Sequence, residues 1–268
     1  MKTSGFASTD RRFRNIPPKK VAEKFATVFW YYELQRQLNL NTPADVQRAI
    51  EEVGDRGVVG VRRRWRDYKS GHHKPVTSVV ELAEQQVPGS KAILQSPLWS
   101  AMRLDKSAIK VAQQLLGKTT KEGDELLEWL LDRQQTSKVD RWLRKRCMAM
   151  VFHATLESLA VLTVCMRLAR SKGMPHWTLT FYHFATDSLM ILGSWFYQHG
   201  IAQASAEYYE KVLLPTCYGK NASWLFSSRD YFYIVRAMAR EALNVQEQAG
   251  RNLTHNEIVS AMLKLLDE

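Results

Sequence analysis

The segment VVGVRRRWRDYKSGHHKP occupies residues 58–75 and contains the most informative pattern in the chain. Apolar residues recur in it at helical spacing, at Val58, Val61, Trp65 and Tyr68. This spacing predicts a short helix with one face docked on a core, so that the two aromatic rings pack inside the protein. Gly71 stands where a helix C-cap glycine belongs, and Pro75 prevents the helix from resuming at once.

The outer face of this predicted helix is strongly cationic, with four arginines within five residues: Arg62, Arg63, Arg64 and Arg66. Asp67 is the only carboxylate in residues 57–80, against six lysines or arginines. An arginine-rich face is often merely solvated, but a solvated helix usually mixes both signs because like charges one turn apart repel. A planar guanidinium matches phosphate groups and guanine edges, so the pattern favours a nucleic-acid contact.

The charge of the whole chain is unevenly distributed. The protein has 268 residues and a net charge of +11, enough chain for one large or two small domains. Residues 1–90 carry a net charge of +6 and residues 91–150 one of +5, whereas residues 151–268 are neutral. This division predicts a polyanionic partner for the first 150 residues and a different task for the rest.

Several functional classes receive no support from the sequence. The three cysteines are far apart and show neither zinc spacing nor a disulfide framework. No phosphate loop, dinucleotide fingerprint or nucleophile elbow occurs, so we expect no cofactor and no enzymatic activity. The polar, basic start lacks a signal-peptide pattern, and we therefore expect a cytoplasmic protein.

Two apolar stretches, residues 147–166 and 177–197, are long enough to be considered as membrane spans. Each carries a histidine and a carboxylate four residues apart: His153 with Glu157, and His183 with Asp187. A central carboxylate costs roughly 2.5–3.5 kcal/mol on insertion, so we expect buried helices and no membrane partner. The same pairs allow a metal site in a helical bundle, although buried histidine–carboxylate hydrogen bonds are the favoured interpretation.

Helical periodicity and turn residues predict an all-α chain. The predicted helices cover residues 19–40, 43–53, the cationic segment up to Gly71, 77–86, 106–116, 124–133, 141–171, 176–199, 201–213, 227–248 and 254–267. The predicted parts are a loose basic arm over 1–18, a helix-turn-helix-like domain over 19–105, a basic helical connector over 106–140 and a helical bundle over 141–268.

The cationic segment resembles the recognition-helix region of the phage-repressor-like helix-turn-helix class, the Xre and Cro/CI type. The residues that carry the resemblance are Gly60-Val61, Trp65 and the run from Tyr68 to Pro75. Tyr68 takes the place of the tryptophan of that class, with Gly71 three residues later and Pro75 seven later. The turn glycine of the class corresponds either to Gly60 or to Gly54, and Gly54 would lengthen the turn by about six residues. The resemblance covers residues 19–89.

This resemblance implies that the arginines face double-stranded DNA, with Arg62, Arg63 and Arg66 as candidates for base edges and Arg64 beside them. At the end of the segment, phosphates would be contacted by Lys69, His72, His73 and Lys74. Further phosphate contacts are expected from Arg11, Arg12 and Arg14 in the arm and from Arg141, Arg144, Lys145 and Arg146.

The helical bundle predicted over residues 141–268 is expected to mediate assembly, as a homo-oligomer or with a partner protein. Transcriptional control is one expected role, and DNA binding in a mobile element or phage-defence locus is another. The alternative is a non-catalytic adaptor or RNA-binding subunit whose basic face docks an acidic partner.

Overall fold

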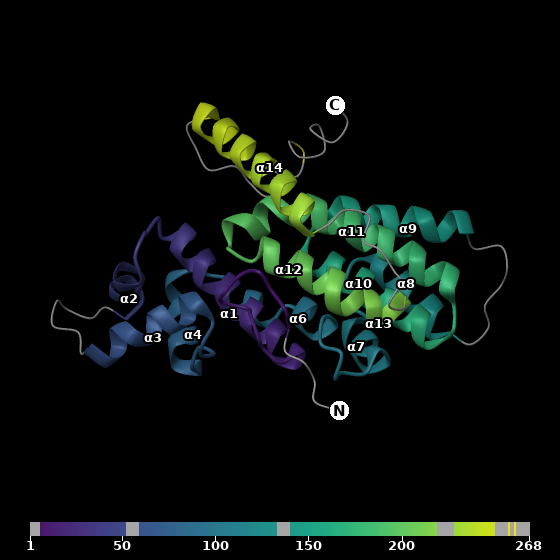
Figure 1. The fold of residues 1–268 in the computed structure, drawn as a ribbon, viewed down its shortest axis with the longest axis horizontal. Coiled ribbons are helices and arrows are strands. Elements are labelled where there is room, and N and C mark those ends of the chain that lie inside the picture. Colours follow the sequence, from purple (N-terminus) through teal and green to yellow (C-terminus); the bar gives the residue numbers. More distant parts are fainter. Residues whose placement is uncertain are drawn as a thin grey trace.

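The computed structural model describes residues 6–51, 59–132, 140–218 and 228–249, together with residues 257 and 260. Helices joined by short loops make up this part of the chain, and its only strand-like pairing is an isolated bridge between Phe6 and Ile16. The predicted all-α class is therefore confirmed. Figure 1 shows an elongated body with α2, α3 and α4 at one end and α8 and α9 at the other.

The first five helices follow the expected order with one addition. Their bounds are α1 Pro18–Gln37, α2 Pro43–Glu51, α3 Val59–Ser70, α4 Thr77–Gln86 and α5 Ser90–Gln95. The short α5 was not expected; it begins after Gly89, which has a φ of 88°. Gly71 has a φ of 67° directly after α3, which confirms the predicted helix stop. Gly54, one of the two candidates for the turn glycine, lies outside the described residues.

These helices enclose a small core of their own. Trp65 and Tyr68 of α3 are almost completely buried against Trp30 of α1, so the predicted docking face is confirmed. The remaining members come from α1, α2, α4 and the residue after α4: Tyr31, Leu34, Val46, Ile50, Val79, Ala83 and Val87. Aromatic and branched side chains from four segments thus fix the position of α3.

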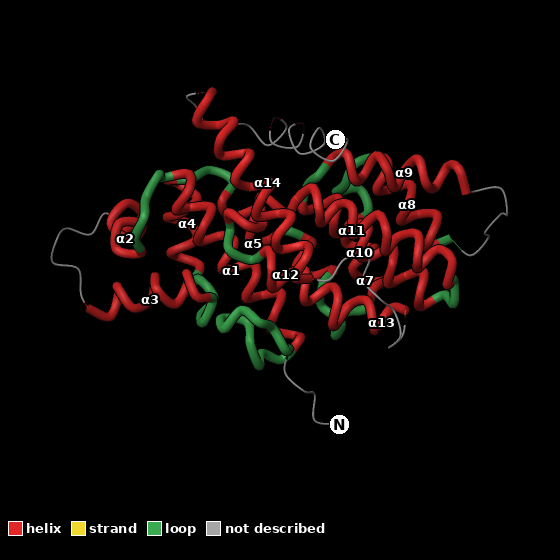
Figure 2. Tube along the Cα trace, turned by 45° about the horizontal axis from the view of Figure 1, so that its top comes forward, coloured by secondary structure: helices red, strands yellow, loops and turns green. Residues whose placement is uncertain are grey.

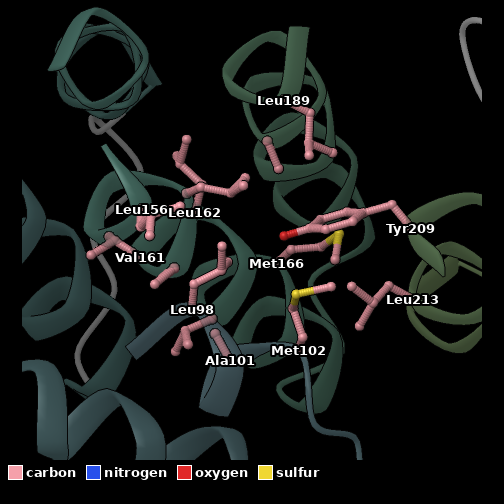
Figure 3. Close-up of a cluster of buried hydrophobic side chains, with 14 of the residues drawn as sticks. Leu98, Ala101, Met102, Leu156, Val161, Leu162, Met166, Leu189, Tyr209 and Leu213 are labelled. Atoms are coloured by element: carbon pink, nitrogen blue, oxygen red, sulfur yellow. The ribbon is translucent and has the colours of Figure 1, made fainter. Parts of the chain in front are cut away.

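A larger core fills the rest of the molecule. Its helices are α6 Pro97–Ala101, α7 Ala108–Leu115, α8 Lys121–Leu131, α9 Asp140–His153, α10 Leu156–Ser171, α11 Pro175–Gln198, α12 Ala202–Tyr208, α13 Leu214–Tyr218 and α14 Ser228–Ala249. A five-residue π-helical stretch, Tyr209–Leu213, joins α12 to α13. Every residue of α10 from Ser158 to Ala169 is buried, which makes α10 the central helix. Figure 3 shows Leu162 and Met166 of this helix facing Leu98 and Tyr209.

The structure corrects the predicted division into parts. α7 and α8, predicted as a connector over residues 106–140, contribute buried leucines to the larger core, including Leu115 and Leu127. α1 belongs to both cores, because Phe25 and Phe29 enter the larger one and Trp30 the smaller one. In the described part of the chain, α7 and α8 thus pack within the larger core, and α1 joins that core to the smaller one.

The long helix predicted over residues 141–171 is wrong, because the structure divides it. Ala154 has a φ of 47°, which ends α9, and the side chain of Thr155 accepts a hydrogen bond from the backbone N of Ser158 at the start of α10. A threonine N-cap satisfies a backbone donor that the helix itself leaves free. None of the helices within the described ranges is both long enough and apolar enough to cross a membrane.

Candidate nucleic-acid interface

Two aromatic residues orient α3. Trp65 stacks on Trp30 with ring centroids 6.0 Å apart, and its Nε1 donates a hydrogen bond to Oε1 of Glu51 at 2.9 Å. Tyr68 meets both indole rings edge-on, and burial raises the pKa of its hydroxyl. The prediction that Trp65 and Tyr68 pack inside the protein is confirmed, and neither ring is available to stack on a base.

The arginines of α3 differ in exposure. Arg63 and Arg66 are exposed, and neither has an ion-pair or hydrogen-bond partner within the described part of the chain. Arg64 is half-buried, with Nη2 3.5 Å from Oε1 of Glu51. The side chain of Arg62 lies outside the described residues. Arg63 and Arg66 are thus the two arginines of this segment with free guanidinium groups in the described structure.

The end of α3 carries the other predicted contacts of this segment. His72, His73 and Lys74 are exposed, and Nζ of Lys69 lies 5.8 Å from the ring centroid of Tyr32. The carboxylate of Asp67 lies 4.0 Å from Nδ1 of His72 and 3.7 Å from Nε2 of His73. Among the described side chains, Asp67 forms no ion pair with an arginine of α3, so it does not neutralise the outer face.

Gly71 brings α3 and α1 into close contact. A Cβ atom at Gly71 would lie 2.6 Å from Cγ of Lys24 and 2.9 Å from Cγ2 of Val28. The positive φ and this close approach both favour glycine at this position. The aliphatic stem of Lys24 therefore crosses directly over the residue that ends the cationic helix.

A groove runs along α1 beside this contact. Its first cavity, of about 390 Å³, is bordered by Lys20, Lys24, His72 and Lys74, among others. A second cavity of about 200 Å³ shares Lys74 with the first and adds other basic residues, Arg103 and Lys106. The groove thus extends the cationic surface from the end of α3 onto α1.

Lys20 and Lys24 were missed by the sequence interpretation. Burial and the nearby charge of Arg12 lower the pKa of Lys24, while Asp10 opposes that shift. The available signal was the position of Lys24 on α1, three residues after Val21 and four before Val28, both of which are buried. A lysine within an apolar helical stripe indicates either a side chain that extends its ammonium group to solvent or a binding site.

The predicted loose arm is wrong for residues 6–17, because this segment is anchored on the body. Phe6 and Phe13 are buried, and Ser8 Oγ donates a hydrogen bond to Oε2 of Glu207 at 2.5 Å. Arg12 Nη2 lies 2.7 Å from Oδ2 of Asp10 and also donates to the carbonyl oxygen of Gly200.

The anchored segment nevertheless lies beside the groove. Arg11 and Arg14 remain exposed, and Arg14 Nε donates to the carbonyl oxygen of Ser8 at 3.3 Å. Asn15, Ile16 and Pro17 form part of the groove wall together with Gly71 and His72. Figure 2 shows this loop close to the end of α3. The structure therefore brings the arm and the end of α3 together.

The basic cluster of α9 lies elsewhere. Arg141, Arg144 and Lys145 are exposed, and Arg146 pairs with Glu125 of α8. Figure 1 places α9 and α3 at opposite ends of the long axis. The phosphate contacts predicted for this cluster therefore do not share a surface with α3.

The histidine–carboxylate pairs of the rear half do not form the hydrogen bonds expected of them. His153 ends α9 whereas Glu157 belongs to α10, and Nε2 of His153 instead lies 3.6 Å from Oε2 of Glu122. Asp187 has a raised pKa because of burial, which the charge of His183 opposes. Within the described residues, no group of three or more histidine, cysteine or acidic side chains is arranged to hold a metal ion.

Comparison with known proteins identifies no family for this chain. The resemblance of residues 19–89 to phage-repressor-like proteins rests on the residues quoted above alone. No protein-family model matches the chain, and neither the curated proteins nor the solved structures yielded a similar protein.

Proposed function

We propose that this protein is a non-catalytic, double-stranded-DNA-binding protein in which α3 enters the major groove. The observation that carries the proposal is the exposure of Arg63 and Arg66 beside a buried aromatic face. Two free guanidinium groups on a rigidly packed helix are well suited to bidentate contacts with guanine edges. At 12 residues, α3 is about 18 Å long, which is enough to reach several base pairs.

In this proposal the last turn of α3 and the residues after it set the register on the duplex. Lys69, His72, His73 and Lys74 contact phosphates, and the exposed Arg11 and Arg14 extend that footprint from the anchored N-terminal segment. Phosphate contacts position the protein, whereas the arginines of α3 supply sequence preference. The lack of net charge in residues 151–268 supports a role for the rear helices in assembly instead.

The proposal covers regulation of transcription or a DNA-binding role in a mobile element or defence locus. Its test is binding of the full chain to duplex DNA, an unrelated duplex and RNA over a range of salt concentrations. We expect preference for one duplex sequence, with affinity falling steeply as salt rises. Steep salt dependence without sequence preference would indicate a general polyanion binder, and absence of nucleic-acid binding would favour an adaptor for an acidic protein.

A double alanine variant assigns the binding to α3. We expect Arg63→Ala with Arg66→Ala to weaken duplex binding by about 1–3 kcal/mol per arginine. Arg141→Ala with Lys145→Ala is the matched control, because it removes the same charge from exposed positions at the other end of the body. Equal losses in the two variants would contradict a specific role for α3.

A further inference from the structure

Lys24 is a largely buried residue whose ammonium group has no direct partner. The residue as a whole is 8% exposed, and no ion pair or hydrogen bond of its ammonium group occurs among the described residues. Its nearest aromatic contact is Phe13, whose ring centroid lies 5.5 Å from Nζ. Proteins normally pair or hydrogen-bond a charge in such partly apolar surroundings, so a ligand in the adjoining cavity would supply the partner that Lys24 lacks.

Basic groups outnumber acidic ones around Lys24, although Asp10 partly opposes their effect on its pKa. Lys20 and Lys74 border the same cavity, and Arg12 lies close enough to lower the pKa of Lys24 by repulsion, in addition to the effect of burial. Glu23 is the one carboxylate among the residues lining the described cavity, and its Oε1 is engaged by Nη1 of Arg103 at 2.7 Å. The cavity therefore presents unneutralised ammonium groups to whatever enters it.

We propose that this groove is a phosphate-binding site in which Lys24, Lys20 and Lys74 hold one phosphate group. Each ammonium offers three donors, and a phosphate offers several strong acceptor oxygens at one centre. Three lysines against one carboxylate that is already paired make the cavity unfavourable for a metal cation. The phosphate belongs either to a nucleic-acid backbone lying against α1 or to a free phosphate or phosphate ester, and both sources present the same group.

Gly71 links this site to the cationic helix. The stem of Lys24 reaches the cavity across the Cα atom of Gly71, in space that any side chain at this position would occupy. Gly71 and His72, at the end of α3, also line the cavity. A phosphate held by Lys24 would therefore lie beside the end of α3 whatever molecule carries it.

The experiment titrates the full chain with inorganic phosphate while following the backbone amide resonances of Gly71 and His72. Sodium chloride of matched ionic strength serves as the blank. Lys24→Met removes the ammonium but keeps an unbranched stem over Gly71, and Lys19→Met is the matched control on an exposed position outside the cavity. We expect saturable shifts in the wild type and in Lys19→Met, and binding weakened about tenfold or more in Lys24→Met.

Two results would overturn the phosphate site. One is the absence of saturable shifts in the wild type, and the other is equal phosphate affinity in Lys24→Met and Lys19→Met. Lys20→Met with Lys74→Met provides a second variant at exposed positions if Lys24→Met does not fold, and it should also weaken phosphate binding.

A second titration with duplex DNA identifies the source of the phosphate. If Lys24→Met weakens duplex binding and inorganic phosphate competes with the duplex, the site takes a backbone phosphate. If duplex binding is unchanged while phosphate binding is lost, the site takes a free phosphate or phosphate ester. The variant with alanine at Arg63 and Arg66 should bind inorganic phosphate like the wild type, so failure of the α3 proposal leaves this test intact.

Discussion

Nε2 of His199 lies 2.6 Å from Oε2 of Glu33, so a buried histidine–carboxylate contact joins α1 to the residue that follows α11. Nδ1 of His199 faces the carbonyl oxygen of Trp195 at 2.7 Å. The imidazole also stacks on Phe29 with centroids 4.0 Å apart. This contact connects α1 to the end of α11.

His199→Ala should destabilise the protein by roughly 1.5–3 kcal/mol, because the buried, ionised carboxylate of Glu33 loses a hydrogen-bond partner. The loss is limited because Arg36 still donates to Glu33, with Nη2 2.7 Å from Oε1. Urea unfolding followed by circular dichroism measures the change. His153→Ala is the control, since His153 is exposed and should have little effect. Equal stabilities of the two variants would contradict the role of His199.

The Glu33 pair also predicts a pH dependence of stability. Burial raises the pKa of Glu33, but hydrogen bonds from His199 and Arg36 outweigh it and hold the pKa well below the ordinary value of 4.5. A lowered folded-state pKa contributes stability above the ordinary value and loses it as pH falls toward the folded-state value. The free energy of unfolding of the wild type should therefore fall relative to Glu33→Gln below about pH 4.5. A constant difference between the two proteins from pH 7 to pH 3 would contradict this.

Gly71→Ala should destabilise the protein more than Gly117→Ala. Both glycines have positive φ, 67° and 71°, so each substitution carries a backbone cost of about 1–2 kcal/mol. Only at Gly71 would the new Cβ collide with Lys24 and Val28, because nothing lies within 4 Å of a Cβ at Gly117. Thermal unfolding of the two variants measures the difference. Equal losses would show that the stem of Lys24 does not pack across Gly71.

Arg66→Ala and Lys74→Ala should affect DNA binding in different ways. Loss of a base-reading arginine should cost about 1–3 kcal/mol on the preferred duplex and relax sequence preference. Loss of a phosphate-contacting lysine should weaken binding evenly across sequences and lower the salt slope by about one. Competition binding with a randomised duplex pool separates these effects. A loss of preference in Lys74→Ala as large as that in Arg66→Ala would contradict the proposed roles.

The sequence predicted the elements whose signals are local. The apolar period of residues 58–68 located Trp65 and Tyr68 inside the small core, and Gly71 marked the end of α3. The exposure of Arg63 and Arg66 followed from the same helical period. These features depend on neighbours within a few turns, which a sequence pattern records directly.

The features that the sequence did not predict depend on distant contacts or on weak local signals. Glu33 and His199 are 166 positions apart, and Ser8 meets Glu207 across 199 positions, so neither contact leaves a periodic trace. Lys24 was missed because it occupies an apolar helical stripe although its own side chain is charged. The break at Ala154 was missed because the apolar pattern continues on both sides of it.

The measurement that tests DNA recognition by α3 most directly is duplex affinity after charge reversal. Arg63→Glu with Arg66→Glu is compared with Arg141→Glu and Lys145→Glu together, at one salt concentration and with the full chain. We predict that reversal on α3 weakens binding about 30-fold or more, since each lost arginine contact costs about 1 kcal/mol or more, and that reversal on α9 has a far smaller effect. Unchanged affinity after reversal on α3, or an equal loss in both variants, would contradict recognition of DNA by this helix.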